Sequence, residues 1–386
     1  MTSEGGTHKF PCPKCGAELN FDANDGTLLC SYCGYQATVP VTEQAIVEYD
    51  LKSALRDMVA APQETGYGEG MRSLKCENCG AVNTVDANLI SAECAFCGSN
   101  HVVPLAQVAQ VIKPESLLPF QVDQRQAVTE FRAWLGRGFF RPNPVKKIAK
   151  DAEAKLQGVY LPFWTFDAHT SSWWRAEAGY HYYVTETYTA TDANGRQVQR
   201  TRQVQKTRWE PASGHLQLHF DDLLVPAADS VELSMIQRIY PFDTTALVPY
   251  EPGFLSGWAA EAYTVGLEKG WEAGQQIMDQ KVREACTREV PGDTHRNLQV
   301  KTAYSHMTYK HVLFPVWIAS YRYGQKVYRF LVNGQTGEVQ GQAPVSWIKV
   351  ALVILLVLAI IALVVWLVSQ GEQGAALNVS RAVFGI

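Results

Sequence analysis

Eight of the nine cysteines occur in pairs separated by two residues, a spacing that can hold a metal ion. Two residues between cysteines form a tight knuckle that aims both sulfurs at one ion, and the glycine after each pair permits close approach of the backbone. Four thiolates close a tetrahedron around Zn²⁺ and leave no coordination position for a substrate. We therefore predict two structural zinc sites, with two Zn²⁺ per chain. Their ligands are Cys12, Cys15, Cys30 and Cys33, and then Cys76, Cys79, Cys94 and Cys97.

The two sets of cysteines are copies of one unit. Each ligand recurs 64 positions later, and Asp22-Ala23-Asn24 recurs as Asp86-Ala87-Asn88. Repetition of ligands and neighbours together indicates an internal duplication, which predicts two zinc ribbons, over residues 1–41 and 71–104. The alternative interpretation, in which each pair is a thiol redox switch, is disfavoured because redox motifs seldom come as two matched pairs of pairs.

A second chemical environment is indicated near the C-terminus. Residues 350–368 contain 19 amino acids without a charge, and as a helix they would span about 28 Å, close to the thickness of a bilayer's hydrocarbon core. A buried core helix of this length would show a polar stripe, and this segment has none. Trp347, Lys349 and Trp366 stand where interfacial anchors are expected. We predict one transmembrane helix over residues 346–369, followed by a short tail over residues 370–386.

The N-terminus predicts which side of the membrane holds the cysteines. Its first 20 residues contain no apolar segment of the kind found in signal peptides. Zinc thiolates also require a reducing compartment. We therefore expect a single-pass protein of the cytoplasmic (inner) membrane, with the N-terminal bulk in the cytoplasm and the tail translocated.

The elements that must position these sites predict an α+β fold. Residues 42–70 read as a helical linker ending in a glycine hinge, and residues 105–345 as a body of helices and antiparallel strands. Within the body we expect one helix over 121–135, capped by Asp123, and a longer one over 265–288. Strands are expected over 312–323 and 326–332, together with a long hairpin over 182–209 that turns at Asn194-Gly195.

The body contains a weaker repeat. Leu118-Pro119-Phe120 precedes a predicted helix and then Pro162-Phe163-Trp164, while Val248-Pro249-Tyr250 precedes the other helix and then Pro315-Val316-Trp317. The offsets of about 130 and 153 residues require an insertion in the second half. Two unrelated aromatic core strands would give the same pattern.

One strand of the predicted hairpin concentrates positive charge. Alternation along a strand places its even-numbered residues on one face. Such a face could bind the phosphates of lipids or of nucleic acid, although a solvated face that discourages edge pairing explains the charges equally well. The residues of this basic face are Arg196, Arg200, Arg202, Lys206 and Arg208.

Several function classes find no support. The chain has no phosphate-binding loop, no dinucleotide fingerprint and no nucleophile elbow, so we expect no enzyme. His215 and His219 would share a strand face, but no carboxylate pattern accompanies them, and we interpret them as structural. The formal net charge is −4, and two four-thiolate zinc centres would add about −2 each, so a global nucleic-acid footprint is absent.

A family resemblance is carried by the knuckles CPKCG and CSYCG, the segments GVYLPFWTFDA (158–168) and YRFLVNGQTGEVQG (328–341), and the C-terminal apolar segment. Through them the chain resembles the family of bacterial transcription factor IIB-type zinc-ribbon membrane proteins. Some members carry labels as primosomal or replication-restart helicases, which the missing phosphate loop contradicts here. The resemblance implies flotillin-like or phage-shock-type partners in membrane stress, and it carries over the eight cysteines alone.

Together these features predict a non-enzymatic membrane adaptor, in which the ribbons dock protein partners at the cytoplasmic face of the lipid bilayer. The alternative is a membrane-tethered protein that binds nucleic acid through the ribbons and the basic face. A thiol redox sensor comes third. No small-molecule substrate is expected.

Overall fold

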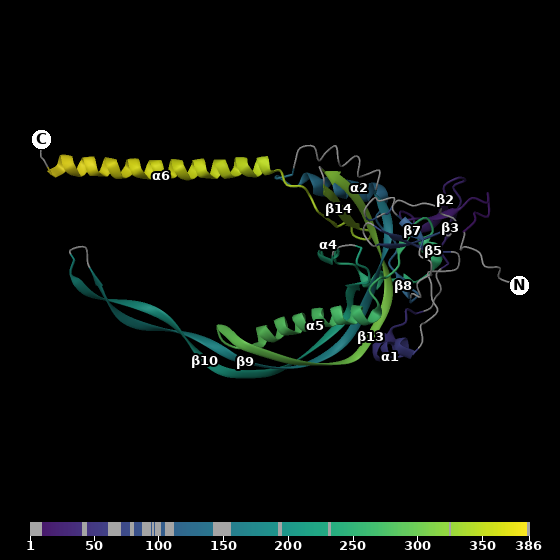
Figure 1. Ribbon diagram of the computed structural model, residues 1–386, viewed down its shortest axis with the longest axis horizontal. Coiled ribbons are helices and arrows are strands. Elements are labelled where there is room, and N and C mark those ends of the chain that lie inside the picture. Colours follow the sequence, from purple (N-terminus) through teal and green to yellow (C-terminus); the bar gives the residue numbers. More distant parts are fainter. Residues whose placement is uncertain are drawn as a thin grey trace.

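The computed structural model describes residues 10–40, 45–60, 71–77, 81–86, 94, 96, 102–104, 112–141, 156–191, 195–230, 233–323 and 326–383. Within them the fold is α+β and the sheets are mostly antiparallel, as predicted (Figure 1). The predicted glycine hinge, at residues 66–70, lies outside the described residues. The same holds for Cys79, Cys97 and Asn194.

Two sheets contain the described strands. The small sheet has the order β1-β2-β3, with β1 Leu19–Asp22, β2 Thr27–Cys30 and β3 Gln36–Thr38. The large sheet has the order β11-β8-β13-β9-β12-β6-β5-β7, while β10 pairs with β9, β4 and β14 pair with β13, and β15 pairs with β14. Its strands are β4 Tyr49–Asp50, β5 Met71–Cys76, β6 Val82–Asp86, β7 Val102–Pro104, β8 Ser116–Leu117, β9 Gln157–Thr191, β10 Gln197–Pro226, β11 Val248–Pro249, β12 Ala259–Glu261, β13 Thr294–Tyr323, β14 Lys326–Asn333 and β15 Val339–Gly341.

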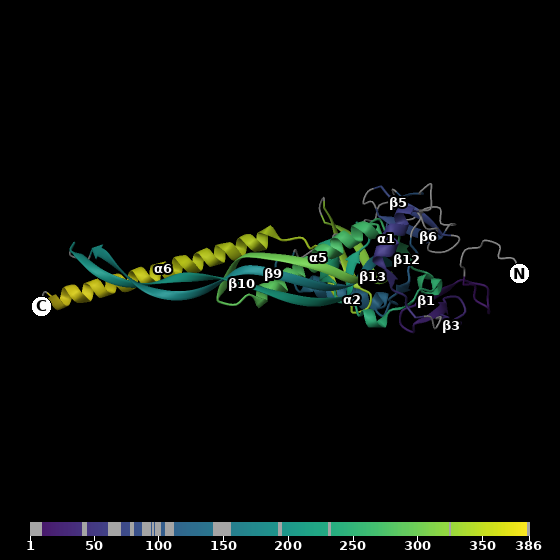
Figure 2. The ribbon, with the colours of Figure 1, turned by 90° about the horizontal axis from the view of Figure 1, so that it is seen from below.

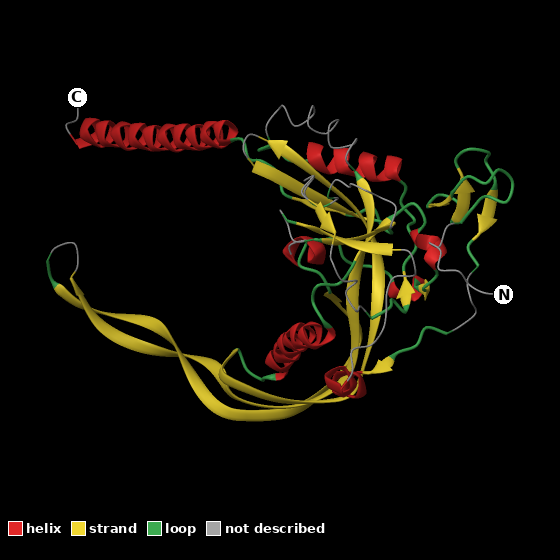
Figure 3. Cartoon of the chain, turned by 45° about the vertical axis from the view of Figure 1, so that its right-hand side comes forward, coloured by secondary structure: helices red, strands yellow, loops and turns green. Residues whose placement is uncertain are grey.

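Helices lie on both sides of the large sheet (Figure 3). The described helices are α1 Leu51–Ala60, α2 Gln124–Gly136, α4 Leu233–Arg238, α5 Leu267–Glu289 and α6 Trp347–Val383, with short 3₁₀ turns η1 Thr244–Ala246 and η2 Pro252–Leu255. α2 confirms the predicted cap, because the Asp123 carboxylate accepts a hydrogen bond of 2.6 Å from the amide of Gln126. α5 confirms the second predicted helix. α1 begins later than its pattern suggested, because Tyr49 and Asp50 pair as β4 with the edge of β13.

The two body helices pack on the sheet in different ways. Phe131 of α2 stacks on Phe330 of β14 with ring centroids 3.6 Å apart. α5 instead approaches the sheet through glycines: a Cβ on Gly270 would lie 2.5 Å from the Trp164 ring, and one on Gly274 would lie 3.0 Å from Phe166. These glycines let α5 lie close over the aromatic side chains of β9.

The register of the strands supports the weaker repeat. Leu161 pairs with Phe314 where β9 meets β13. Three residues after each of them comes a tryptophan, and the indole of each tryptophan contacts the other half. Trp164 donates to the carbonyl of Val265, just before α5, at 2.9 Å, and Trp317 donates to the carbonyl of Val122, just before α2, at 2.8 Å. These two matched hydrogen bonds fasten the segments to each other, as two related halves would require.

The first half carries a long extension that the second half lacks. β9 and β10 form a hairpin far longer than the predicted 182–209, and within the described residues β13 accompanies β9 only as far as Gly179. We call the two-stranded part beyond it, residues 180–191 and 197–208, the arm. It projects from the body as a twisted ribbon (Figures 1 and 2).

The second half ends in α6, which is long and apolar enough to cross a membrane. Its most apolar stretch, Trp347–Val364, is 0% buried against the protein. The helix continues to Val383, beyond the end predicted at residue 369, and no proline interrupts the residues that follow the apolar stretch. At its first turn the Lys349 ammonium donates to the carbonyls of Phe139 and Arg141, at 3.2 and 2.8 Å.

Candidate metal centre

The four cysteines of ribbon 1 come together as the sequence predicted. Their sulfurs all lie within 4.8 Å of one another. The Sγ of Cys12 is 3.5 Å from that of Cys33, and the Sγ of Cys15 is 3.5 Å from that of Cys30. Because zinc–sulfur bonds of about 2.3 Å give a tetrahedron with edges of about 3.8 Å, one Zn²⁺ fits this cluster. The residues could therefore hold a single metal ion without rearrangement.

Backbone hydrogen bonds build the two knuckles of ribbon 1 in the same way. Gly16 donates to the carbonyl of Cys12 at 2.8 Å, and Gly34 donates to the carbonyl of Cys30 at 2.9 Å. Both glycines have a positive φ, +76° and +71°, which a side chain would strain. This conformation explains why each cysteine pair of ribbon 1 is followed by glycine.

The thiols of the cluster differ in how easily they lose a proton. Partial desolvation and hydrogen bonds with neighbouring thiols raise the pKa of Cys15 and of Cys33. A hydrogen bond from the backbone of Cys33 lowers the pKa of the Cys30 thiol to about 6. Thiolates are the form that binds zinc, so an amide that stabilises a thiolate also favours the metal. Cys12 and Cys30 are buried, whereas Cys15 is exposed at the tip.

Ribbon 2 is described only in part. Cys76 and Cys94 are buried in one apolar cluster with Phe96 and with strands β9 and β13 of the body. Cys76 donates to the carbonyl of Ala81 at 2.8 Å, as Cys12 donates to that of Ala17 at 2.6 Å, so the first knuckle of each ribbon starts with the same turn. Because Cys79 and Cys97 lie outside the described residues, the second zinc ion stays a prediction.

Ribbon 1 docks on the body through the segment that follows η2. The amide of Phe21 donates to the carbonyl of Ser256 at 2.9 Å, and the indole of Trp258 donates to the carbonyl of Phe21 at 3.1 Å. The rings of Phe21 and Phe254 meet edge to face at 5.2 Å. These contacts make the buried side of the ribbon continuous with the core around α2.

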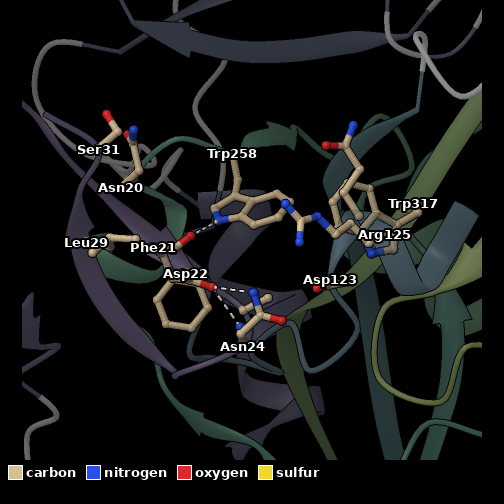
Figure 4. Close-up of a pocket in the computed structure, with 12 residues that line it drawn as sticks. Asn20, Phe21, Asp22, Asn24, Leu29, Ser31, Asp123, Arg125, Trp258 and Trp317 are labelled. Atoms are coloured by element: carbon tan, nitrogen blue, oxygen red, sulfur yellow. Dashed lines mark hydrogen bonds between the residues drawn. The ribbon is translucent and has the colours of Figure 1, made fainter. Parts of the chain in front are cut away.

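A cavity of about 470 Å³ lies between ribbon 1 and the start of α2 (Figure 4). Its lining includes the Asp22-Ala23-Asn24 turn, the indoles of Trp258 and Trp317, and the first residues of α2 with Arg125. The Asp22 carboxylate accepts from the amide and the side chain of Asn24, at 2.8 and 3.0 Å, which fixes the turn. Carboxylates, a guanidinium and apolar rings together suit a polar side chain of a partner. The repeat of Asp-Ala-Asn was the one sequence signal for this cavity.

Four residues of the predicted basic face lie along β10 in the arm, and Arg196 directly precedes that strand. Arg200, Lys206 and Arg208 pair with tyrosines of β9, whereas Arg202 pairs with Glu186. Arg202 and Lys206 both contact the Glu186 carboxylate, at 3.4 and 3.0 Å, and Arg208 contacts Glu210 at 3.0 Å. Arg202 and Arg208 also lie over the rings of Tyr188 and Tyr180. Much of the positive charge is therefore compensated within the arm, as the solvated-face interpretation requires.

One polar cluster in the sheet had no sequence signal. Lys310, almost fully buried in β13, contacts Glu48 at 2.9 Å and Asp222 at 2.8 Å. Asp167 of β9 lies beside them, and its burial raises the pKa of its carboxyl group. These four residues are up to 262 positions apart, so no local pattern could have joined them.

Comparisons with known proteins give a single relative to report. The chain is 25% identical over 344 residues to the uncharacterized protein YdjG of Bacillus subtilis (strain 168), over 89% of this chain and 92% of the relative. An alignment of this length extends far beyond the predicted ribbons and must include most of the body. No family model matches the chain. No solved structure matches it.

Proposed function

We propose that the protein is a non-enzymatic, membrane-anchored adaptor whose zinc ribbons dock a protein partner at the cytoplasmic face of the membrane. The observation that carries this proposal is the four-cysteine cluster of ribbon 1. Four sulfurs saturate a tetrahedral zinc ion, so such a site stabilises a surface and leaves no place for a substrate on the metal.

The opposite end of the chain supports an anchor. The helix that follows the body is apolar over 18 residues and is not covered by the protein. A helix satisfies its own backbone hydrogen bonds, so lipid has only to cover its apolar side chains. In this proposal the helix spans the cytoplasmic membrane and the N-terminal bulk stays in the cytoplasm, where thiolates remain reduced.

Family resemblance supplies the class of partner, which is flotillin-like or phage-shock-type. The cavity beside ribbon 1 supplies the surface, because it joins the ribbon to α2 and presents both charged and aromatic groups. Loss of the metal from ribbon 1 would remove one wall of this cavity.

The test uses the full-length protein in nanodiscs and purified flotillin-like and phage-shock-type proteins of the same organism. We expect one of them to bind the parent, and Cys12→Ser to weaken that binding at least about tenfold, as loss of a central contact does. Cys286→Ala, which changes a buried cysteine outside the ribbons, is the matched control. Absence of binding to both proteins, or equal binding by Cys12→Ser, would contradict the proposal.

A second function is favoured by the arm, where basic and aromatic side chains alternate on one face. This pattern suits phosphate groups, so the arm would bind nucleic acid or anionic lipid. Replacing Arg200, Arg202 and Lys206 together with Gln should then weaken binding of the nanodisc protein to single-stranded DNA, or to anionic vesicles, at physiological salt. Parent binding should fall steeply with added salt. If the parent and the triple variant bind equally well, the basic face does not bind phosphate groups and is only a solvated surface.

A further inference from the structure

Three histidines from three adjacent strands meet on the open side of the large sheet, opposite α5. His169 of β9 is the central one. Its ring lies 4.4 Å from the ring of His219 in β10 and 5.1 Å from the ring of His306 in β13, measured between centroids. All three side chains are exposed. We call this group the histidine triad.

Two irregularities of the sheet flank the central histidine. The register between β9 and β10 shifts between Phe220 and Leu223, and the register between β9 and β13 shifts between Ser305 and Thr308. Such bulges add a residue to one strand and redirect its side chains. His306 is within the second bulge and has a φ of +49°, so the bulge brings it beside His169 although Ser305 is the paired residue.

One carboxylate fastens both bulges. Asp167 lies two residues before His169 and so on the same face of β9. One of its oxygens accepts from the amide of Asp222 in the first bulge at 2.6 Å, and the other accepts from the hydroxyl of Thr308 in the second at 2.7 Å. Asp222 itself has a φ of +46°. The sheet is thus held in an unusual shape at the level where His169 contacts His219 on one side and His306 on the other.

Carboxyl groups lie near the triad along the same strands. Glu48 and Asp222 contact the Lys310 ammonium, and Thr308 donates to both Glu48 and Asp167. Neutral imidazoles at ordinary pH can approach one another without repulsion, and each offers a nitrogen lone pair. Imidazole is the ligand that Zn²⁺, Cu²⁺ and Ni²⁺ share.

We propose that His169, His219 and His306 form a binding site for a divalent transition-metal ion, with Zn²⁺ as the ion to test, separate from both cysteine ribbons. Among the described residues, only the ribbon 1 cysteines bring their ligand atoms within 4.8 Å of one another. To bind one ion, the three exposed imidazoles would have to turn about their side-chain bonds, so the proposed site is one that the ion itself completes. Three nitrogens leave a fourth position for water or for a group from a partner.

The site would join β10, β9 and β13 at the root of the arm. A ribbon of two strands is only marginally stable in water by itself. An ion held by all three strands would fix the direction in which the arm leaves the body. This role involves only the body and the arm, so a failure of the metal-site proposal would leave the adaptor proposal unchanged, and the reverse is also true.

The experiment titrates full-length protein in nanodiscs, with its cysteine ribbons already loaded with zinc, against Zn²⁺ in a calorimeter at pH 7.5. We expect one further equivalent to bind. His169→Ala should abolish it, and His219→Ala should weaken it at least about tenfold, as the loss of a ligand does. His306→Asn is preferred to alanine at the third position, because asparagine tolerates a positive φ, and it should weaken binding to a similar extent. Binding should also weaken in acid, because protons compete with the metal ion for ring nitrogens.

His215→Ala is the matched control. His215 lies on the same open face of β10, but its ring contacts Trp173 and its Nε2 lies 2.8 Å from the Ser171 hydroxyl, away from the triad. This variant should bind the further zinc ion as the parent does. The proposal is overturned if the parent binds no zinc beyond the ribbons. It is also overturned if the triad variants, shown to be folded by their thermal melts, bind zinc as well as His215→Ala does.

Discussion

The two cysteine ribbons are close copies in sequence but are attached to the body in different ways. Ribbon 1 has its own three-stranded sheet and docks through side chains and a few hydrogen bonds around Trp258. The strands of ribbon 2 are part of the large sheet, because β6 pairs with β12, which in turn pairs with β9. One copy is therefore an attached unit and the other a part of the body's framework. We expect that damage to ribbon 1 stays local and that damage to ribbon 2 spreads.

Cys76→Ser should have the largest effect. It removes a ligand of the predicted second zinc site, whose metal would contribute to folding, and it places a hydroxyl in the apolar cluster shared with β9 and β13. We expect the melting temperature of the whole protein to fall by about 10 °C, with loss of bound zinc. Cys286→Ala is the control for loss of a buried sulfur. A melt unchanged from the control would show that ribbon 2 is as independent as ribbon 1.

Acid should next weaken the attachment of ribbon 2. His311 resists protonation, because burial lowers its pKa from 6.5 to about 4. Its Nδ1 lies 2.7 Å from the carbonyl oxygen of Ile112, which follows ribbon 2 in the chain. The unfolded chain binds a proton below pH 6.5 and the folded chain does not, so stability falls as the pH drops from 6.5 to 4. The loss should approach about 3 kcal/mol.

The measurement for His311 is the free energy of unfolding by urea at several pH values. His311→Gln should flatten the slope between pH 6.5 and 4, while exposed His181→Gln should keep it. Equal slopes in the parent and His311→Gln would assign the acid sensitivity to other groups.

Cys12→Ser should have a smaller and local effect. Ribbon 1 should lose its metal and open, while the body keeps its sheet, so the main melt should move by no more than about 3 °C. Hydrogen exchange followed by mass spectrometry should show loss of protection over residues 19–38 and none over β9. Spread of the loss into β9 would remove the distinction between the ribbons.

Trp258→Phe should have the smallest effect. It removes the hydrogen bond to the Phe21 carbonyl but keeps an aromatic ring against Phe120, whose ring lies 4.2 Å away. Undocking of ribbon 1 should become easier by about 1 kcal/mol, seen as faster exchange in β1 with the metal retained. The reverse pattern, with metal lost and exchange unchanged, would mean that Trp258 supports the zinc site and not the docking.

The sequence could predict the features that depend on local patterns, but not those that depend on pairing between distant segments. Cysteine spacing, the Asp123 cap and the periodicity of α5 are local signals, and each led to a feature that the structure contains. The attachment of ribbon 2 depends on pairing with β12, nearly two hundred residues away, which no local pattern encodes. The histidine triad and the cluster around Lys310 fall in the same class. His215 and His219 were recognised as sharing a face, but the histidine that meets His219 is on β9, and the one that meets His169 in turn is on β13.

The start of α6 has a mechanical consequence. α6 and the arm leave the body toward the same end of the molecule (Figures 1 and 2). The arm, about 40 Å of polar ribbon with open strand edges, cannot enter hydrocarbon. When α6 lies in a bilayer, the helix and the body must therefore turn relative to each other, with residues 342–346 as the joint. The strain of that turn falls on residues 139–141, which hold Lys349 and Ser346 and directly follow α2. The other end of α2 lines the cavity beside ribbon 1. A tilt of α6 would therefore move α2, and α2 would change the shape of the cavity next to the ribbon.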